Sequence, residues 1–351
     1  MNNSLSFDEL MMKRCLQLAE QGKYYAPPNP LVGAVLVYNG TIIGEGYHQQ
    51  FGGPHAEVNC INSVKEQDKH CIAYSTLYVS LEPCAHYGKT PPCTNLIIQY
   101  HIPNVVIGCR DSFTEVNGKG IEKLQQAGVK VCIGVLEKEC KEINRKFFVL
   151  NDEKRPYIIL KWAQTVNGIM GNKGKERLMI SNDAVNRWVH AWRAECSAIL
   201  VGTTTVLQDN PQLNNRFASG KSPVRLVIDK HLALPVSWHV LDNSVRTIVF
   251  NFLKNEVRGQ TEWVQCNITD DLTIQIVEYC LKAGLQSILV EGGARLLNSF
   301  IKNNMWDESR VITASHLAVA EGVSAPHLTG CSQFRTHHIL NNRVDFFKRL
   351  S

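Results

Sequence analysis

The stretch from His55 to Cys93 decides how this chain is read. It runs His55-Ala56-Glu57 and then, after an apolar segment, Leu81-Glu82-Pro83-Cys84-Ala85-His86-Tyr87-Gly88-Lys89-Thr90-Pro91-Pro92-Cys93. One histidine and two cysteines supply three protein ligands of the kind that Zn²⁺ prefers. Because three ligands leave one tetrahedral position open, the pattern predicts a catalytic zinc site at His55, Cys84 and Cys93.

Glu57 follows His55 by two residues, so it shares this site without being needed as a ligand. The zinc deaminases combine a metal that activates water with a glutamate that is not a ligand and moves the proton. The spacing between Cys84 and Cys93 is longer than the Cys-x-x-Cys of their general signature. The pattern therefore predicts a deaminase in which Glu57 is catalytic, and a purely structural zinc site is the main alternative.

Length and composition indicate two domains in a cytoplasmic protein. The chain has 351 residues with 44% hydrophobic content, and the polar stretch 151–156 ends in a proline, which predicts domains at 1–150 and 151–351. A net charge of +5 without a dense Lys/Arg run fits a small anionic substrate and argues against nucleic acid. The 12 scattered cysteines and the lack of an apolar leader favour a reducing cytoplasm, and no segment is apolar for long enough to span a membrane.

Strands alternate with helices along the first domain, which predicts an α/β sandwich. Ser6 and Glu9 form a capping box at the start of a helix, and Asn39-Gly40 predicts a tight hairpin. We expect Cys84 to stand at the start of a helix that continues past Cys93. The other expected elements are strands at 32–38, 41–48, 76–81, 105–108 and 129–135 and helices at 55–64 and 121–126.

Strands and helices also alternate along the second domain. Expected strands are 157–163, 198–201, 224–229, 245–251 and 287–291, and expected helices are 182–193 and 294–301. Gly292-Gly293 precedes the last helix, where free backbone N–H groups can hold a phosphate, although a glycine pair also serves as a plain tight turn. The chain lacks the G-x-G-x-x-G fingerprint of dinucleotide-binding Rossmann domains, so the residues alone do not indicate a nicotinamide cofactor.

The first domain resembles the deaminase half of the bifunctional riboflavin-biosynthesis deaminase/reductases. The resemblance rests on four motifs: Pro28-Asn29-Pro30-x-Val32-Gly33-Ala34, Gly53-Pro54-His55-Ala56-Glu57, Leu81-Glu82-Pro83-Cys84-x-His86-x-Gly88-Lys89-Thr90-Pro91-Pro92-Cys93 and Asn117-Gly118-Lys119-Gly120. The Gly88-Lys89-Thr90-Pro91-Pro92 insertion between the two cysteines is a feature of this family. The resemblance implies a cytidine-deaminase-like α/β/α sandwich. It also implies that the substrate is a diaminopyrimidinone ribosylamino 5′-phosphate, which loses its 2-amino group, with Asn29, His48 and Lys89 as substrate contacts.

The second domain resembles the reductase half of the same family, which is similar to dihydrofolate reductase and uses NADPH. The matching motifs are Lys161-Trp162-Ala163-Gln164-Thr165, Gly202-x-Thr204-Thr205-Val206-x-x-Asp209-x-Pro211-x-Leu213 and Val290-Glu291-Gly292-Gly293. The resemblance implies hydride delivery to C1′ of the opened ribose. It places Ala163, Thr205, Asp209, Gly292 and Gly293 at cofactor positions, and at substrate positions it places Lys161, Met179, Arg193, Leu213, Arg216 and Glu291.

Two departures from the family pattern leave an alternative open. Asn167 stands where the family usually has an aspartate, and Met179 where it usually has a tryptophan. An active deaminase with a degenerate reductase domain is therefore one alternative. Others are a nucleic-acid deaminase and a non-catalytic zinc-binding module. The expected partners are a phosphorylated pyrimidine and further copies of the chain, as a dimer or tetramer, without nucleic acid or membrane.

Overall fold

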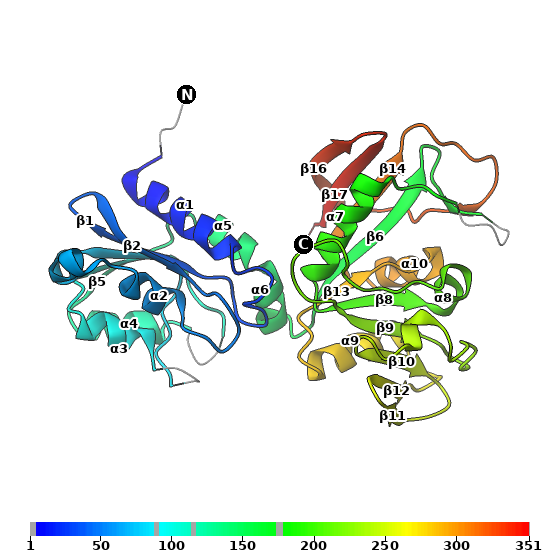
Figure 1. Ribbon diagram of the computed structural model, residues 1–351, viewed down its shortest axis with the longest axis horizontal. Coiled ribbons are helices and arrows are strands. Elements are labelled where there is room, and N and C mark those ends of the chain that lie inside the picture. The colour runs from blue at the N-terminus through cyan, green and yellow to red at the C-terminus, as the bar shows by residue number, and fades with distance from the viewer. Residues whose placement is uncertain (1–4, 88–90, 114–116, 173–177, 351) are drawn as a thin grey trace. The chain divides into compact units, whose positions relative to one another are not determined.

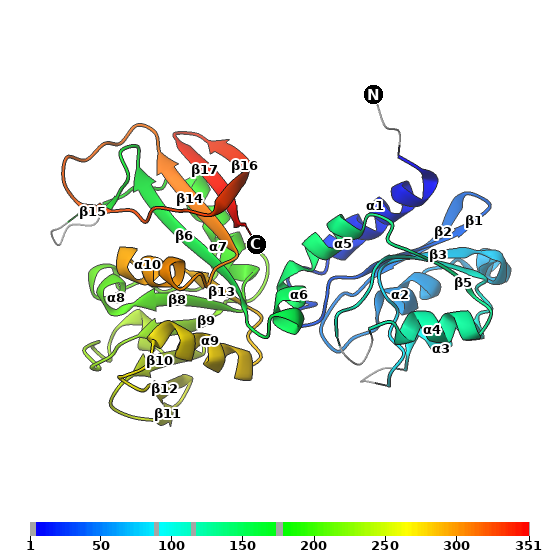
Figure 2. The same ribbon diagram turned by 180° about the vertical axis from the view of Figure 1, so that it is seen from behind.

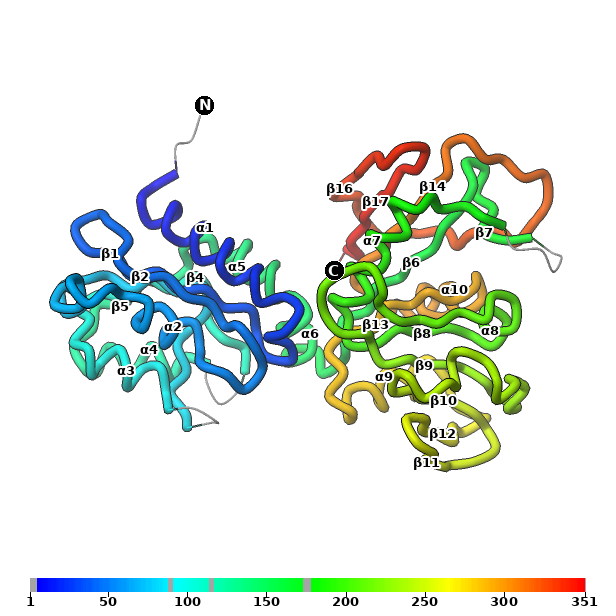
Figure 3. Tube along the Cα trace, in the orientation of Figure 1, coloured from blue at the N-terminus to red at the C-terminus, as the bar shows by residue number. Residues whose placement is uncertain are grey.

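The chain folds into two compact units, Met1–Lys154 and Arg155–Ser351. A computed structural model describes residues 5–87, 91–113, 117–172 and 178–350 (Figures 1 and 3). The division between the units falls inside the polar stretch 151–156, and the last helix of the first unit, α6 (Arg145–Asp152), ends there.

A five-stranded sheet forms the centre of the first unit. Its order is β2-β1-β3-β4-β5, with β1 antiparallel to β2 and β3 and with β3, β4 and β5 parallel. The hairpin between β1 and β2 turns at Asn39 and Gly40, both with positive φ, as the Asn-Gly pair predicts. The strands are β1 (Gly33–Tyr38), β2 (Thr41–Tyr47), β3 (Thr76–Leu81), β4 (Asn104–Cys109) and β5 (Lys130–Ile133).

Helices cover both faces of this sheet (Figures 1 and 2). Apolar side chains of α2 (Ala56–Asn62), α3 (Cys93–Gln99) and α4 (Lys119–Gln126) pack on one set of alternating strand residues, and those of α1 (Phe7–Glu20) and α5 (Glu137–Ile143) on the other. A 3₁₀-helix, η1 (Glu66–Tyr74), leads into β3. The predicted α/β/α sandwich is confirmed, as is the capping box of Ser6 and Glu9 on α1.

One expectation about the metal loop is wrong. Cys84 does not open a helix: residues 82–87 form no regular element, and α3 begins at Cys93. Prolines explain the difference, because Pro83 restricts Glu82, and Pro92 restricts Pro91, to extended backbone. A proline is tolerated only at the very start of a helix, and Pro92 is the N-cap of α3.

The second unit contains a ten-stranded sheet in the order β11-β12-β10-β9-β8-β13-β6-β14-β17-β16. The strands from β12 to β14 in this order are parallel, and β11, β17 and β16 are antiparallel additions at the two edges. The central strands are β6 (Tyr157–Thr165), β8 (Ala198–Gly202), β9 (Val224–Ile228), β10 (Thr247–Asn251), β12 (Thr261–Gln265), β13 (Ser287–Val290) and β14 (Glu308–Ala314). The edge strands are β11 (Glu256–Arg258), β16 (Cys331–Ile339) and β17 (Asn342–Arg349).

Helices and two short strands complete the second unit. They are α7 (Asp183–Ala194), α8 (Thr203–Asp209), α9 (Leu272–Lys282) and α10 (Ala294–Lys302), the 3₁₀-helix η2 (His239–Leu241), and the pair β7 (Ile169–Gly171) and β15 (Val323–Ser324). Apolar residues of α9 and α10 pack against β6, β8, β9, β10 and β13 to form the largest core. All six tryptophans of the chain belong to this unit. No helix within the described ranges is long and apolar enough to cross a membrane.

Candidate functional site

His55, Cys84 and Cys93 meet at one end of the first sheet. Their potential ligand atoms all lie within 4.8 Å of one another. The His55 Nδ1 atom is 3.3 Å from the Cys93 sulfur and 3.6 Å from the Cys84 sulfur. Zinc bonds of about 2.0–2.3 Å in a tetrahedron place ligand atoms about 3.5 Å apart, so the three residues fit a zinc ion.

Three different elements bring these ligands together. His55 is the N-cap of α2, Cys84 lies in the loop after β3, and Cys93 is the first residue of α3. The backbone N–H of Cys93 donates to the Cys84 sulfur at 3.3 Å. Free N–H groups at helix N-termini favour a negative sulfur, so the start of α3 stabilises the thiolate form of Cys84.

The contact between the Cys84 and Cys93 thiols moves their pKa values in opposite directions. Donation from the Cys93 thiol lowers the pKa of Cys84 to about 4; burial opposes this shift, and hydrogen bonds from His55 and the Cys93 backbone add to it. The same contact with Cys84, together with burial, raises the pKa of Cys93. Cys84 is therefore the first of the two to become a thiolate, which is the form that binds a metal.

Glu57 lies in the first turn of α2, beside the three ligands, and its residue surface is only 3% exposed. Burial raises the pKa of its carboxyl; His55 opposes this shift and Cys84 adds to it. A raised pKa brings a glutamate closer to the working pH of a general acid–base group. Glu57 thus has the position and the proton affinity to exchange protons beside the metal.

His48 and Asn29 form a second pair at this site. The His48 Nδ1 atom lies 2.9 Å from the Pro54 carbonyl, which can only accept, so Nδ1 carries the proton. The unprotonated Nε2 atom then accepts from the Asn29 side-chain amide at 3.0 Å. This orientation leaves the Asn29 carbonyl oxygen as a hydrogen-bond acceptor for another group. Lys89, the third expected substrate contact of this half, lies outside the described residues.

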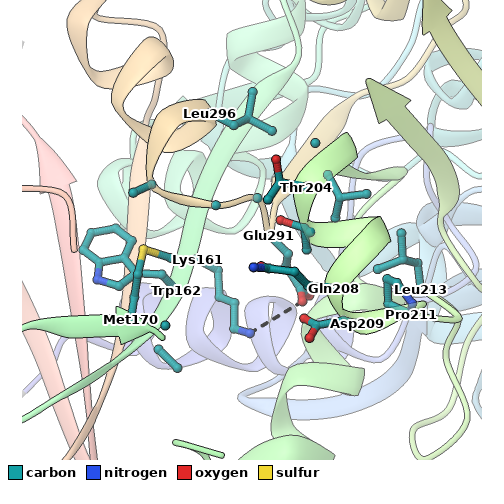
Figure 4. Close-up of a pocket in the computed structure, with 18 of the residues that line it drawn as sticks. Lys161, Trp162, Met170, Thr204, Gln208, Asp209, Pro211, Leu213, Glu291 and Leu296 are labelled. Carbon is teal, nitrogen blue, oxygen red and sulfur yellow. Dashed lines mark ion pairs between the residues drawn. The ribbon is translucent and has the colours of Figure 1, made fainter. Parts of the chain in front are cut away.

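A cavity of about 1380 Å³ occupies the second unit, at the carboxyl ends of β8, β9 and β13. Side chains from β6 and α8 face each other across it (Figure 4). All eleven cofactor and substrate positions that the resemblance implied for this half line this one cavity: Lys161, Ala163, Met179, Arg193, Thr205, Asp209, Leu213, Arg216, Glu291, Gly292 and Gly293.

Glu291 is the electrostatic centre of this cavity. Its carboxylate accepts a bidentate pair of hydrogen bonds from Arg193, at 3.0 and 2.9 Å, and lies 3.5 Å from the Lys161 ammonium (Figure 4). Burial raises the pKa of Glu291, but the charges of Arg193 and Lys161 outweigh this effect and hold it at about 2. The guanidinium fork of Arg193 is therefore already filled by a carboxylate of the protein.

The glycine pair allows a close approach at the start of α10. A Cβ atom on Gly292 would lie 2.5 Å from the Leu296 side chain, so a larger residue there would require Leu296 to move. A Cβ atom on Gly293 would lie 3.6 Å from the Thr205 hydroxyl, which places the starts of α8 and α10 side by side. The start of α10 has no side-chain cap and its first residues line the cavity, so its free N–H groups are available to an anion there.

The two departures from the family pattern differ in their surroundings. Asn167 lies outside the cavity lining; its amide donates to the Val319 carbonyl at 2.8 Å, a contact that an aspartate could not make. Met179 lines the cavity and is 63% exposed. Sequence reasoning missed further lining residues, among them Gln208 and His190; His190 stands one helical turn before Arg193, a spacing that could have indicated it.

Together, the fold and the two sites define a bifunctional enzyme, in which a zinc-binding deaminase unit precedes a reductase unit. Residues 5–109 match the model of the cytidine and deoxycytidylate deaminase zinc-binding region, and residues 156–343 match the RibD C-terminal domain. The chain belongs to the RibD family of riboflavin biosynthesis proteins.

Relatives and solved structures agree over nearly the full length. The chain is 40% identical to riboflavin biosynthesis protein RibD of Aquifex aeolicus, with 90% of this chain and 89% of the relative covered. It is 33% identical to RibD of Escherichia coli, with 88% of each covered. The structure of a diaminohydroxyphosphoribosylaminopyrimidine deaminase/5-amino-6-(5-phosphoribosylamino)uracil reductase from Thermotoga maritima matches with a TM-score of 0.89 at 34% identity, covering 98% of this chain and 99% of that one.

Proposed function

We propose that the chain catalyses two consecutive steps on one pyrimidine. The first removes the 2-amino group of 2,5-diamino-6-ribosylamino-4(3H)-pyrimidinone 5′-phosphate by hydrolysis, in the unit that ends at Lys154. The second reduces the ribosyl group of the product to a ribityl chain, in the other unit. The observation that carries the proposal is the pairing of a three-ligand metal site and a buried Glu57 with a separate cavity lined by every expected reductase position.

His55, Cys84 and Cys93 hold the zinc ion of the deaminase. When bound there, zinc lowers the pKa of water at its open position to about 7. Glu57 would accept one proton from this water and pass it to the ring nitrogen, and would then carry the second proton, from the hydroxyl added to the ring carbon, to the departing amine. Asn29 offers its carbonyl oxygen to an N–H or O–H group of the substrate, and His48, with both ring nitrogens engaged, orients it.

In the reductase unit, NADPH supplies the hydride that reduces C1′ of the opened sugar. The uncapped start of α10 at Gly292-Gly293 would hold the cofactor diphosphate, with Thr205 beside it and with Ala163 and Asp209 as further contacts. Arg193 and Lys161 keep Glu291 ionised and oriented towards the substrate. The substrate phosphate is then bound by Arg216, which lines the same cavity and whose guanidinium donates a hydrogen bond to the neutral side chain of Gln212.

Two further parts of the proposal concern the setting of the enzyme. We place it in the cytoplasm, because 12 cysteines remain free thiols. We also expect it to assemble into a dimer or tetramer. The alternative of a degenerate reductase is not favoured, because Asn167 acts outside the cavity and the Glu291 ion-pair network is complete.

The decisive test of the first step is Glu57→Gln. An amide cannot accept the proton, so we expect full zinc occupancy with deamination reduced by about 100- to 10,000-fold, as is typical when a general acid–base group is lost. Ammonia release and metal content are measured on the same preparation. Reduction of the deaminated intermediate with NADPH serves as the internal control. Wild-type deamination rates in a variant with full zinc would exclude Glu57 as the proton carrier.

A further inference from the structure

Glu82 is a buried carboxylate with no assigned role, two residues before the metal ligand Cys84. It is 4% exposed, and among the described residues it forms no ion pair with a Lys, Arg or His side chain. Its charge is instead met by backbone N–H groups. A carboxylate buried without a counter-ion is costly unless such donors surround it, so its position demands a structural reason.

Four backbone N–H groups from two separate segments converge on Glu82. One oxygen accepts from Asp111 at 3.3 Å and from Gly118 at 3.1 Å, and the other accepts from Gly120 at 3.0 Å and Ile121 at 3.4 Å. Asp111 follows β4, whereas the other three belong to the start of α4. One side chain therefore joins the metal loop to both of these segments.

The donors from α4 are the ones that a helix leaves unsatisfied at its N-terminus. Gly118 is the N-cap of α4 and has no side chain to satisfy them; its positive φ of 83° suits glycine. Glu82 replaces the missing cap from a distant part of the chain. Its negative charge is also favourable at this end of the helix.

The contact extends to the backbone beside Cys84. A Cβ atom on Gly120 would lie only 2.1 Å from the Pro83 carbonyl oxygen, so the start of α4 lies directly against the residue before the metal ligand. The segment after β4, whose backbone N–H at Asp111 donates to Glu82, also carries the 7% exposed carboxyl of Asp111. A displacement of Glu82 would therefore displace both segments beside the metal loop, the start of α4 and the residues after β4.

We propose that Glu82 is a positioning residue of the deaminase: by gathering the four N–H groups, it fixes the path of the chain into Cys84 and holds the Asp111 segment and α4 beside it. The inference rests on the proposed deaminase function. Glu82 does not touch the substrate and acts only through these segments. The competing explanation is that it caps α4 and contributes to stability alone.

The test uses Glu82→Gln in the full-length protein, loaded with zinc or with Co²⁺. The amide has the same shape, but its NH₂ group meets N–H donors instead of accepting from them. Visible absorption of the Co²⁺ form reports the geometry of the ligands independently of turnover. We expect one metal ion per chain, shifted Co²⁺ bands, and a deaminase kcat reduced by about 10- to 100-fold with a smaller change in KM, as for other residues that orient metal ligands.

Ser6→Ala is the matched control, because it also removes a helix cap in the first unit, far along the chain from the metal loop. If Glu82→Gln and Ser6→Ala both lower the thermal midpoint while keeping wild-type Co²⁺ bands and kcat, Glu82 is a cap only and the inference is wrong. If Glu82→Gln does not fold, Glu82→Asp is measured in the same way, and unchanged bands with unchanged kcat would again reject the inference. A wild-type enzyme that releases no ammonia would reject the proposed function instead, while the Co²⁺ spectra would still test Glu82.

Discussion

Replacing Glu291 by glutamine should destabilise the second unit in a way that depends on pH. The carboxylate lies between Arg193 and Lys161, each with 14% of its side chain exposed, and its pKa is about 2 rather than 4.5. The difference of about 2.5 pKa units corresponds to about 3 kcal/mol of stability. Glutamine also leaves two buried cations without a counter-charge, and breaking a buried pair costs about 3–5 kcal/mol.

The sign of the pH dependence follows from the lowered pKa. A carboxyl with a depressed pKa contributes its full stability above the unfolded value of 4.5, and this contribution is lost as pH falls from 4.5 towards about 2. The protonated glutamic acid then resembles glutamine. The stability difference between wild type and Glu291→Gln should therefore be largest near neutral pH and should shrink towards zero across this range.

Urea unfolding followed by tryptophan fluorescence measures this difference in the full chain, because all six tryptophans belong to the second unit. Glu262→Gln is the control: its partner Arg246 has 47% of its side chain exposed, and such surface pairs contribute about 0–1 kcal/mol. A Glu291→Gln variant with a wild-type midpoint at neutral pH, or with a difference that does not narrow on acidification, would show that Glu291 is not held ionised by Arg193 and Lys161.

Three shorter predictions concern other residues. Cys84→Ser replaces a thiolate ligand by a neutral hydroxyl, so we expect metal analysis to find less than one zinc per chain while NADPH oxidation continues; full occupancy would contradict the ligand assignment. Arg216→Ala should raise the reductase KM for substrate far more than that for NADPH, whereas an effect confined to NADPH would mean that the two binding regions are reversed. Asn167→Asp loses the donation to Val319 and should cost about 1 kcal/mol of stability by tryptophan-monitored unfolding, with reductase kcat retained; loss of reduction would place Asn167 in the active site.

Local signals in the sequence predicted most of the first unit. The Asn39-Gly40 turn requires positive φ at both residues, and the apolar run 76–81 could hardly form anything but a buried strand. A helix was wrongly expected to begin at Cys84, because the apolar residues after Cys93 continue a helical pattern. Pro83 and Pro91-Pro92 oppose a helix in the preceding part of the sequence. The edge strand β16 was not predicted, because it is almost wholly exposed and no apolar pattern marks it.

The same distinction between local and long-range signals applies to the two candidate sites. The clustering of His55, Cys84 and Cys93 could be predicted because metal chemistry dictates such residue types and spacing. The reductase positions came from resemblance alone, because no local pattern announces a cavity assembled from β6, α7, α8 and α10. The role of Glu82 was invisible in the sequence, although the residue stands in the metal motif, because its partners lie about 30 or more positions further along the chain.

The segregation of the tryptophans gives the enzyme two separate optical signals. The reduced nicotinamide absorbs light where tryptophan emits, and Trp162 lines the cavity of the second unit, so energy transfer to NADPH should quench the emission when the cofactor binds (Figure 4). The first unit contains no tryptophan, so it contributes no tryptophan emission to such a titration. If Co²⁺ were bound by His55, Cys84 and Cys93, its visible absorption would report on the site of the first unit. Arrival of the intermediate at the second site could then be timed against its departure from the first in one intact chain.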